Sequence, residues 1–248
     1  NTGAAQVIPN PAPGQTVGPS GLEFGHYRPV TVVARVFEEL TNLPPDNAYT
    51  LGDSGIPTAT VTITTTGGPV TPLSVSSIDA TGLITFTLVP TNSATPYWVN
   101  VAPITGFERS PGNTGAAQVI PNPSPGQTVG PSGLEFGHYR PVTVVARVFD
   151  ENPPVDNVYQ AGDTGITTAT VTITTTNGTV TPLSVTPIDP TTGLITFTLV
   201  PTDSATPYWV NVAPIAGFER SPGNTGAAQV IPNPAPGQTV GPSGLEFG

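Results

Sequence analysis

Short stretches in which apolar and polar residues alternate recur along the chain. They lie at 30–37, 59–64, 84–88 and 97–101, and equivalent stretches follow in the second half. Successive side chains of a β-strand point to opposite faces, so this period predicts half-buried strands of antiparallel sheets. The apolar row of each strand is expected to face a core, and the alternate row to face outward.

One long string of residues occurs three times. Its copies occupy 1–25, 113–137 and 224–248, and they differ only at Ser124, which is alanine in the other two. Repetition at this spacing is typical of tandem arrays, in which one structural unit follows another. A further short strand-like stretch, Leu-Glu-Phe, lies near the end of each copy, before its last glycine.

The repeats divide the chain into a first unit, 26–137, and a second unit, 138–248. We interpret 1–25 as the C-terminal strand segment of a preceding repeat. On this interpretation the chain is a segment of a longer covalent array of repeats. A second interpretation makes this segment a donor strand that completes the sheet of another copy. Its apolar anchors would be Val7, Ile8, Leu22 and Phe24.

The composition favours strands and turns over helices. The chain has 28 glycines and 32 prolines, and both residues disfavour the interior of a helix. About six or seven short strands fit into each unit, which predicts an all-β fold of tandem β-sandwich domains.

The charge excludes several classes of partner. The formal net charge is −10, the six basic residues are all arginine, and cysteine is absent. Nucleic acids and anionic membranes attract basic surfaces, so we expect neither as a partner. No apolar run reaches the roughly 20 residues of a membrane span, so we expect no membrane insertion in this segment. Because the chain has no cysteine and no lysine, disulfide bonds, lysine Schiff bases and lysine-based isopeptide crosslinks are also excluded.

Two protease-like motifs occur at one equivalent position of the two units. Residues 52–55 read Gly-Asp-Ser-Gly, and 163–165 read Asp-Thr-Gly. One loop cannot supply the nucleophile of one mechanism and the acid of another, so both motifs are interpreted as turns. We therefore do not expect an enzyme, and no catalytic residue is assigned.

Two kinds of residue stand out as candidates for an interface. His26 and His138 are the only histidines and occupy equivalent positions at the start of each unit. Trp98 and Trp209 are expected on the face opposite the core. The two tryptophans either contact a partner, for example by stacking on a carbohydrate, or are covered by the proline-rich segment of their own unit.

Three segments of the second unit, together with the junction between repeats, resemble the B-type domains of serine-aspartate repeat adhesins. These segments are VARVFDENPPVDNVYQAGDTGITTATVTITTTNG, DPTTGLITFTLVP, PYWVNVAPIAGFERSPGN, and LEFG joined to HYRP. The resemblance covers both units and implies Greek-key sandwiches, immunoglobulin-like or prealbumin-like, arranged end to end as a rod. It also places a hinge near His26 and near His138, with almost no linker.

The resemblance further implies a calcium-binding loop after the first strand of each unit. Hard divalent cations take oxygen ligands, which these loops contain. Gln160 and Thr50 stand where the family has an aspartate, so a solvated acidic turn is the alternative interpretation. No other cofactor is expected. The candidate ligands are Glu38, Asp46, Asn47 and Asp53 in the first unit and Asp150, Asn152, Asp156, Asn157 and Asp163 in the second.

These observations predict a structural role. We expect a repeat unit of an extracellular bacterial or archaeal surface fibre or filament, with a mechanical or spacer function. Its partners would be neighbouring repeats or copies of itself, joined head to tail or bundled laterally. The alternative is the stalk or binding modules of a cell-surface adhesin that recognises a host protein or glycan.

Overall fold

The computed structural model describes residues 12, 13, 15, 25–92, 95–120, 123–203, 205–231 and 234–248. The described residues form four sheets and no helix, so the all-β prediction is confirmed. The predicted anchors Val7, Ile8, Leu22 and Phe24 lie outside the described residues.

The alternating stretches of the first unit form its longer strands, and paired residues elsewhere form short ones. The strands are β1 (Val30–Glu38), β2 (Ser54–Gly55), β3 (Val61–Thr65), β4 (Gly68–Pro69), β5 (Ser74–Val75), β6 (Leu83–Leu88), β7 (Tyr97–Val101), β8 (Glu108–Arg109), β9 (Gln118–Ile120), β10 (Thr128–Val129) and β11 (Glu135–Tyr139).

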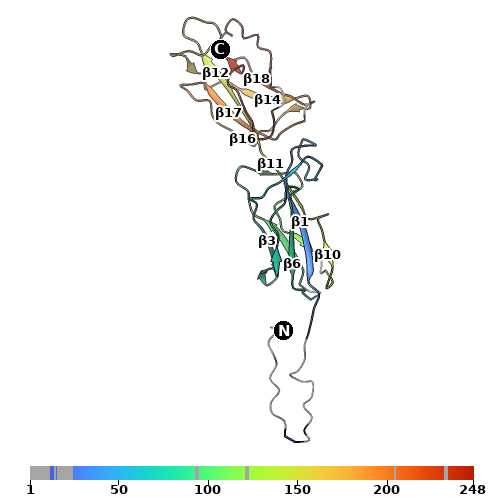
Figure 1. Ribbon diagram of the computed structural model, residues 1–248. Coiled ribbons are helices and arrows are strands. Elements are labelled where there is room, and N and C mark those ends of the chain that lie inside the picture. Colours follow the sequence, from blue (N-terminus) through green and yellow to red (C-terminus); the bar gives the residue numbers. More distant parts are fainter. Residues whose placement is uncertain are drawn as a thin grey trace.

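Two sheets make up this part of the chain (Figure 1). One has the order β5-β6-β1-β11-β8, with β2 and β10 also paired to β1, and the other has the order β4-β3-β7-β9. β1 and β6 run antiparallel from the pair Val30 and Leu88 to the pair Arg35 and Leu83. The central position of β1 makes it the strand that organises the first sheet.

A single hydrophobic core lies between the two sheets. Val30, Val32 and Val36 on β1 are fully buried and cluster with Tyr97 and Val99 on β7 of the other sheet. Each large apolar side chain buried in this way contributes roughly 1.5–3 kcal/mol to folding. The two facing sheets with one shared core are consistent with a β-sandwich.

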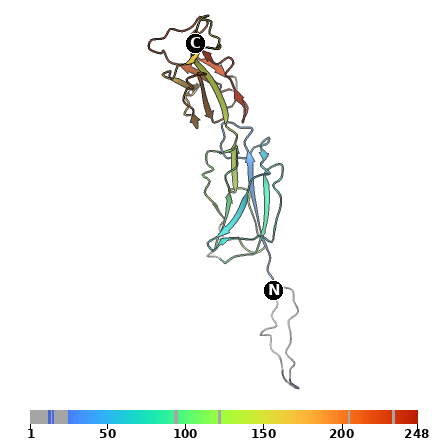
Figure 2. The same cartoon turned by 90° about the vertical axis from the view of Figure 1, so that its left-hand side faces the viewer.

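The second unit repeats this arrangement around β12 (Figures 1 and 2). A separate core cluster, with Val142, Val144 and Tyr208 among its members, fills it. Its strands are β12 (Val142–Asp150), β13 (Thr164–Gly165), β14 (Val171–Thr175), β15 (Gly178–Thr179), β16 (Ser184–Val185), β17 (Leu194–Leu199), β18 (Tyr208–Val212), β19 (Gln229–Ile231), β20 (Thr239–Val240) and β21 (Glu246–Phe247).

The strand that closes the first unit runs parallel to β1. β11 pairs with β1 from Arg35 and Glu135 through Glu38 and His138. The Arg35 Nη1 atom lies 3.1 Å from a carboxylate oxygen of Glu135, and the side chain of Phe136 enters the core. The repeated string therefore supplies both a core side chain and a charged partner for the outer face of β1.

We predict that Gly82→Ala destabilises the first unit far more than Gly106→Ala. Both glycines have a positive φ, +86° and +83°, which costs an L residue about 1 kcal/mol. A Cβ at Gly82 would in addition collide with the Val36 carbonyl oxygen on β1, whereas Gly106 has open space. Thermal unfolding should show a loss of more than about 2 kcal/mol for Gly82→Ala. Equal losses in the two variants would contradict the close approach at Gly82.

Candidate functional site at the joint between the units

The chain passes directly from the closing strand of the first unit to the first strand of the second. Only Arg140 and Pro141 separate β11 from β12. The pairing of β11 continues past the repeated string, because His138 lies opposite Glu38 on one side and Arg109 on the other, and Tyr139 lies opposite Glu108. The joint is thus built on strand pairing, with little free chain.

His138 is buried within this pairing. Its side chain is 1% exposed, and its Nδ1 donates to the Phe136 carbonyl oxygen at 3.1 Å. The other ring nitrogen, Nε2, is buried without a hydrogen-bond partner. Burial lowers the pKa of the His138 imidazole below its ordinary 6.5, and the Arg109 guanidinium acts in the same direction. The imidazole is therefore held neutral.

Tyr139 lies between the two units. Its backbone belongs to the first unit's sheet, and its side chain is 4% exposed. Burial raises the pKa of the Tyr139 hydroxyl, and the nearby Glu108 carboxylate raises it further. Burial also raises the pKa of Tyr208 in the second unit, with a smaller contribution from Tyr139. Tyr139 thus lies close to the core of the unit that follows.

Arg140 bonds to both units at once. Its Nε lies 2.5 Å from the Glu38 Oε1 atom of the first unit, and its guanidinium lies 6.0 Å from the centre of the Phe107 ring. Its backbone carbonyl accepts a hydrogen bond of 3.1 Å from the Gly237 N–H of the second unit. The charge pair is partly exposed and therefore contributes modestly, but the three contacts together restrict the angle between the units.

Gly137, just before the joint, is clamped by side-chain amides. Its N–H donates to the Asn47 Oδ1 atom at 2.6 Å, and its carbonyl accepts from the Asn113 Nδ2 atom at 3.0 Å. Asn47 has a φ of 65°, a conformation that asparagine tolerates better than most residues. In the second unit Asn157 and Asn224 make the same two bonds to Gly248. The clamp is a repeated feature.

The predicted calcium ligands of the first unit are engaged in hydrogen bonds within the protein. Asp53 accepts bonds from the N–H groups of Leu40, Thr41 and Thr50. Burial alone would raise the pKa of the Asp53 carboxyl, but these bonds together outweigh it and hold that pKa below its usual value. Asp46 accepts from the Ala48 N–H, Asn47 belongs to the Gly137 clamp, and Glu38 pairs with Arg140.

The second loop is arranged in a similar way. Asp163 accepts bonds from the Asn152 and Gln160 N–H groups, and Asp156 accepts one from Val158. The Asn157 Oδ1 atom accepts the Gly248 N–H, as described above, and Asp150 is exposed. In the described part of the chain no group of three or more His, Cys, Asp or Glu side chains is placed to hold a metal ion. Calcium binding stays a prediction.

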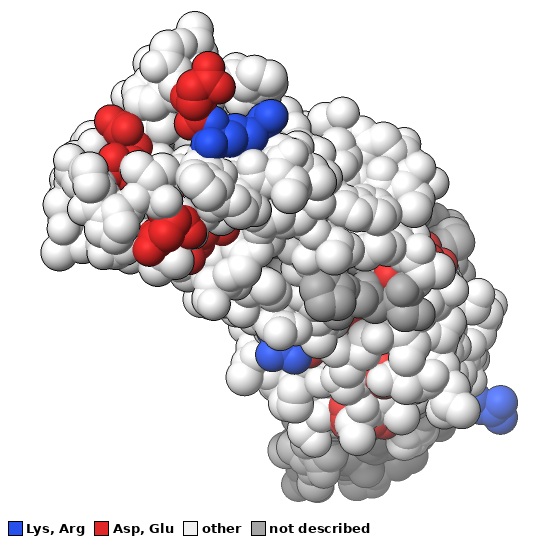
Figure 3. Space-filling view, turned by 90° about the horizontal axis from the view of Figure 1, so that it is seen from above, with Lys and Arg blue, Asp and Glu red and all other residues white. Residues whose placement is uncertain are grey.

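On the face that Figure 3 shows, the acidic side chains do not form one continuous surface. Figure 3 views the molecule from above and shows them in several separate groups, one of them beside an arginine. The carboxylates of the two loops are used for local hydrogen bonds, as described above. Their arrangement therefore fits a structural role in shaping each loop.

The other interface candidates differ in their surroundings. Trp98 and Trp209 are half-buried on the outer face of β7 and β18, where each lies opposite an exposed valine, Val119 or Val230. The exposed valines belong to β9 and β19, the first strands of the proline-rich segments. Each proline-rich segment therefore lies beside its tryptophan but leaves it partly exposed. His26 is exposed, in contrast to the equivalent His138.

The sequence analysis did not identify Tyr139, Arg140 or Asn113 as joint residues. A signal was present, since the repeated string always begins with asparagine and the tetrapeptide His-Tyr-Arg-Pro follows it twice. Comparison with known families finds no family model that matches the chain. A search of curated proteins likewise finds no match. Among the described residues, no helix has the length and apolar character of a membrane span.

We predict that the first unit loses stability as the pH falls below about 6.5, because of His138. The unfolded chain binds a proton at an ordinary histidine pKa, whereas the folded imidazole resists protonation down to its lowered pKa. Protonation therefore favours unfolding between these two values. Thermal unfolding from about pH 7 to pH 5 should show this slope, and His138→Asn should flatten it.

His26→Asn is the matched control, since His26 is exposed and outside any strand. It should leave the slope unchanged. A slope that is the same in wild type and His138→Asn would contradict the assignment to His138.

Proposed function

We propose that the protein is a structural repeat unit of an extracellular surface fibre or filament, with a mechanical or spacer role. The joint contacts of Arg140 carry this proposal. One residue binds Glu38 of the first unit through its side chain and Gly237 of the second through its carbonyl. A contact of this kind resists bending between successive units, which a spacer requires.

The repetition supports the same role. The string of 1–25, 113–137 and 224–248 is nearly invariant, so successive units present nearly the same surface. In a tandem array each unit contacts only its neighbours, and length is gained by adding units. The short connection of Arg140 and Pro141 limits flexing further, because proline fixes its own φ.

The finer features of the proposal follow the resemblance to B-type adhesin domains. Each unit is a Greek-key sandwich of the prealbumin-like or immunoglobulin-like kind, and successive sandwiches lie end to end as a rod. The partners are neighbouring repeats or copies of the same chain. The location is extracellular or at the cell surface.

Two measurements on native material test this function. The native protein, fully denatured, should have a mass well above the 25.3 kDa of this chain, as a tandem array requires. Antibodies against the repeated string should label extracellular fibres at regular intervals in electron micrographs. A native mass near that of this chain, with label absent from fibres, would contradict the proposal. Label scattered on the cell body, with binding to a host protein or glycan, would favour an adhesin instead.

We predict that Arg140→Ala loosens the joint without unfolding either unit. The side chain is 47% exposed, so its loss removes the bond to Glu38 and the contact with Phe107 but leaves both cores intact. Small-angle scattering should show a broader distribution of maximum dimensions. The unfolding temperature of the first unit should fall slightly, because the nearly buried Glu38 carboxylate loses its partner, and that of the second unit should stay unchanged. The control is Leu73→Ala, an exposed site beside Thr87, at the end of β1 that lies far from the joint. Identical scattering curves for Arg140→Ala and wild type would show that Arg140 does not restrict the joint.

A further inference from the structure

One sheet of each unit is built from strands without a charged residue. These sheets are β4-β3-β7-β9 in the first unit and β15-β14-β18-β19 in the second. The strands of the other sheets carry charges, among them Arg35, Glu38, Glu135, Arg147 and Glu246. In a chain with a formal net charge of −10, the outer side of the uncharged strands is therefore neutral.

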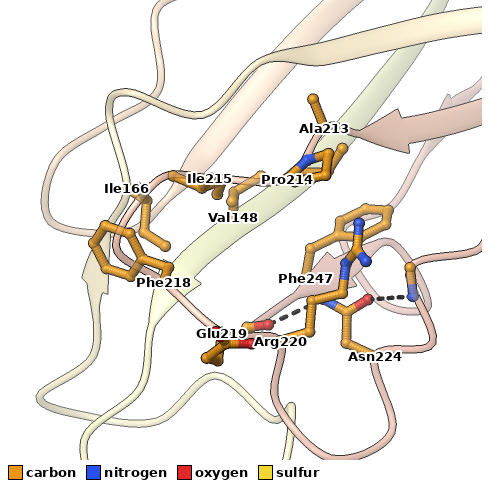
Figure 4. A pocket seen from close by; sticks show the side chains of 13 residues that line it. Val148, Ile166, Ala213, Pro214, Ile215, Phe218, Glu219, Arg220, Asn224 and Phe247 are labelled. Atoms are coloured by element: carbon orange, nitrogen blue, oxygen red, sulfur yellow. Dashed lines mark hydrogen bonds between the residues drawn. The ribbon is translucent and has the colours of Figure 1, made fainter.

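Charged residues return beyond the ends of these strands. After β18 the first of them are Glu219 and Arg220, which line a cavity of about 250 Å³ past the end of the strand (Figure 4). In the first unit the equivalent Glu108 and Arg109 form β8, a strand of the other sheet. In neither unit do the charged residues that follow interrupt the neutral strands.

The outer face of the neutral sheet holds a tryptophan among polar and apolar neighbours. Trp98 on β7 lies opposite Thr64 on β3 and Val119 on β9, and the next outward pair is Thr62 and Asn100. Thr62 is exposed, Val119 is 54% exposed, and Trp98 is half-buried. Because neighbouring strands lie about 4.8 Å apart, the row from Thr64 to Val119 extends about 10 Å across the sheet, with the indole at its middle.

The amide of Asn100 is oriented by the same face. Its Nδ2 atom donates to the Thr64 Oγ1 atom at 3.1 Å and to the Trp98 carbonyl oxygen at 3.5 Å. These two bonds use the donors of the amide, so its Oδ1 atom is left as an acceptor for a ligand. The face thus offers hydroxyl groups and an amide oxygen next to an aromatic ring.

The second unit repeats this face residue for residue. Trp209 lies opposite Thr174 and Val230, and Thr172 lies opposite Asn211. The Asn211 Nδ2 atom donates to the Thr174 Oγ1 atom at 3.0 Å, and Val230 is again 54% exposed. The loop after the first strand, in contrast, differs between the units in both sequence and length. The two units therefore present the same neutral face.

We propose that this face of each unit binds a neutral polysaccharide. The C–H groups on the face of a sugar ring stack on an indole, and its hydroxyl groups exchange hydrogen bonds with nearby hydroxyl and amide groups. In the first unit Trp98 supplies the stacking surface and Val119 extends it. Thr62 and Asn100 supply the hydrogen-bonding groups beside it.

The composition of the face favours this ligand over a second copy of the chain. Interfaces between identical subunits are more apolar than the ordinary protein surface, whereas Thr62, Thr64 and Asn100 make up most of this face around one indole. Charged polymers are disfavoured, because the face has no charge to pair with theirs. A polysaccharide also repeats its own sugar unit, so that weak sites on successive protein units can engage one polymer and add to a strong attachment.

The test uses the two tryptophans as reporters, because the chain has no others. The 248-residue chain is titrated with soluble oligosaccharides of cellulose, chitin, mannan and starch, and its depletion from solution by the parent polysaccharides is measured in parallel. We expect a change in tryptophan fluorescence with at least one series, at two sites per chain. Raising the salt concentration from about 50 to about 500 mM should leave the dissociation constant unchanged, because no charge pair forms.

Variants of the face locate the binding. Trp98→Ala and Trp209→Ala should each remove one of the two sites and leave the other, and the double variant should bind no polysaccharide. Val119→Ala combined with Val230→Ala changes exposed positions, so both cores stay intact, and it should raise the dissociation constant several-fold. This second pair keeps the test decisive even where a tryptophan variant unfolds, which thermal unfolding would reveal.

The matched control is Leu73→Ala combined with Leu183→Ala. Both are exposed apolar positions, and each pairs through its N–H with a strand of the charged sheet, to Thr87 or Thr198. This variant should bind the oligosaccharides as the wild type does.

Other results would overturn the proposal. Absence of binding to all four polysaccharides does so, and so does binding that the tryptophan and valine variants leave unchanged. Self-association that the tryptophan variants abolish, without polysaccharide binding, would assign the face to a second copy of the chain. Polysaccharide binding is a role beyond the proposed spacer function, and its failure would not alter the denatured mass or the labelling of fibres by which that function is tested.

Discussion

The parallel pairing of β11 with β1 is the interaction on which the rest of the structure depends. β1 lies at the centre of the first sheet, and β11 completes that sheet while bringing Phe136 into the core. The same strand continues into His138 and Tyr139 and leads within two residues to β12. Closure of one unit and connection to the next are therefore one continuous piece of backbone, and neither can change without the other.

The acidic loops support this closure. Glu39 is 1% exposed and accepts the N–H groups of Asp46 and Asn47, and burial raises the pKa of its carboxyl. These bonds fix Asn47 in the conformation that reaches Gly137. A carboxylate that accepts hydrogen bonds from backbone N–H groups needs no basic partner. In a chain with few arginines, acidic side chains can therefore be paired with backbone amides instead. The loop that resembles a cation site thus orders the end of the closing strand.

The sequence predicted the strands whose one face is buried, and it did so for a physical reason. β1, β3, β6 and β7 alternate because their inner residues share one core, and this alternation is visible without a structure. The two-residue strands β2, β4 and β5 carry no such signal, since they exist only through pairing with a neighbour. The parallel direction of β11 and the reach of Arg140 across the joint likewise depend on residues about a hundred positions away.

The joint also explains why near-identical units suit a repeated structure. Phe107, His138 and Arg140 each have an identical residue at the equivalent position of the other repeat, and an acidic residue occupies the position of Glu38 in both units. The residue types that form the joint are therefore repeated. The second unit has Asp150 at the position of Glu38, and its side chain is shorter by one methylene group. Glu38 and Asp150 end the first long strand of their units, β1 and β12, and neither belongs to the closing strand, so this difference between the units leaves the residues of the closing strand unchanged.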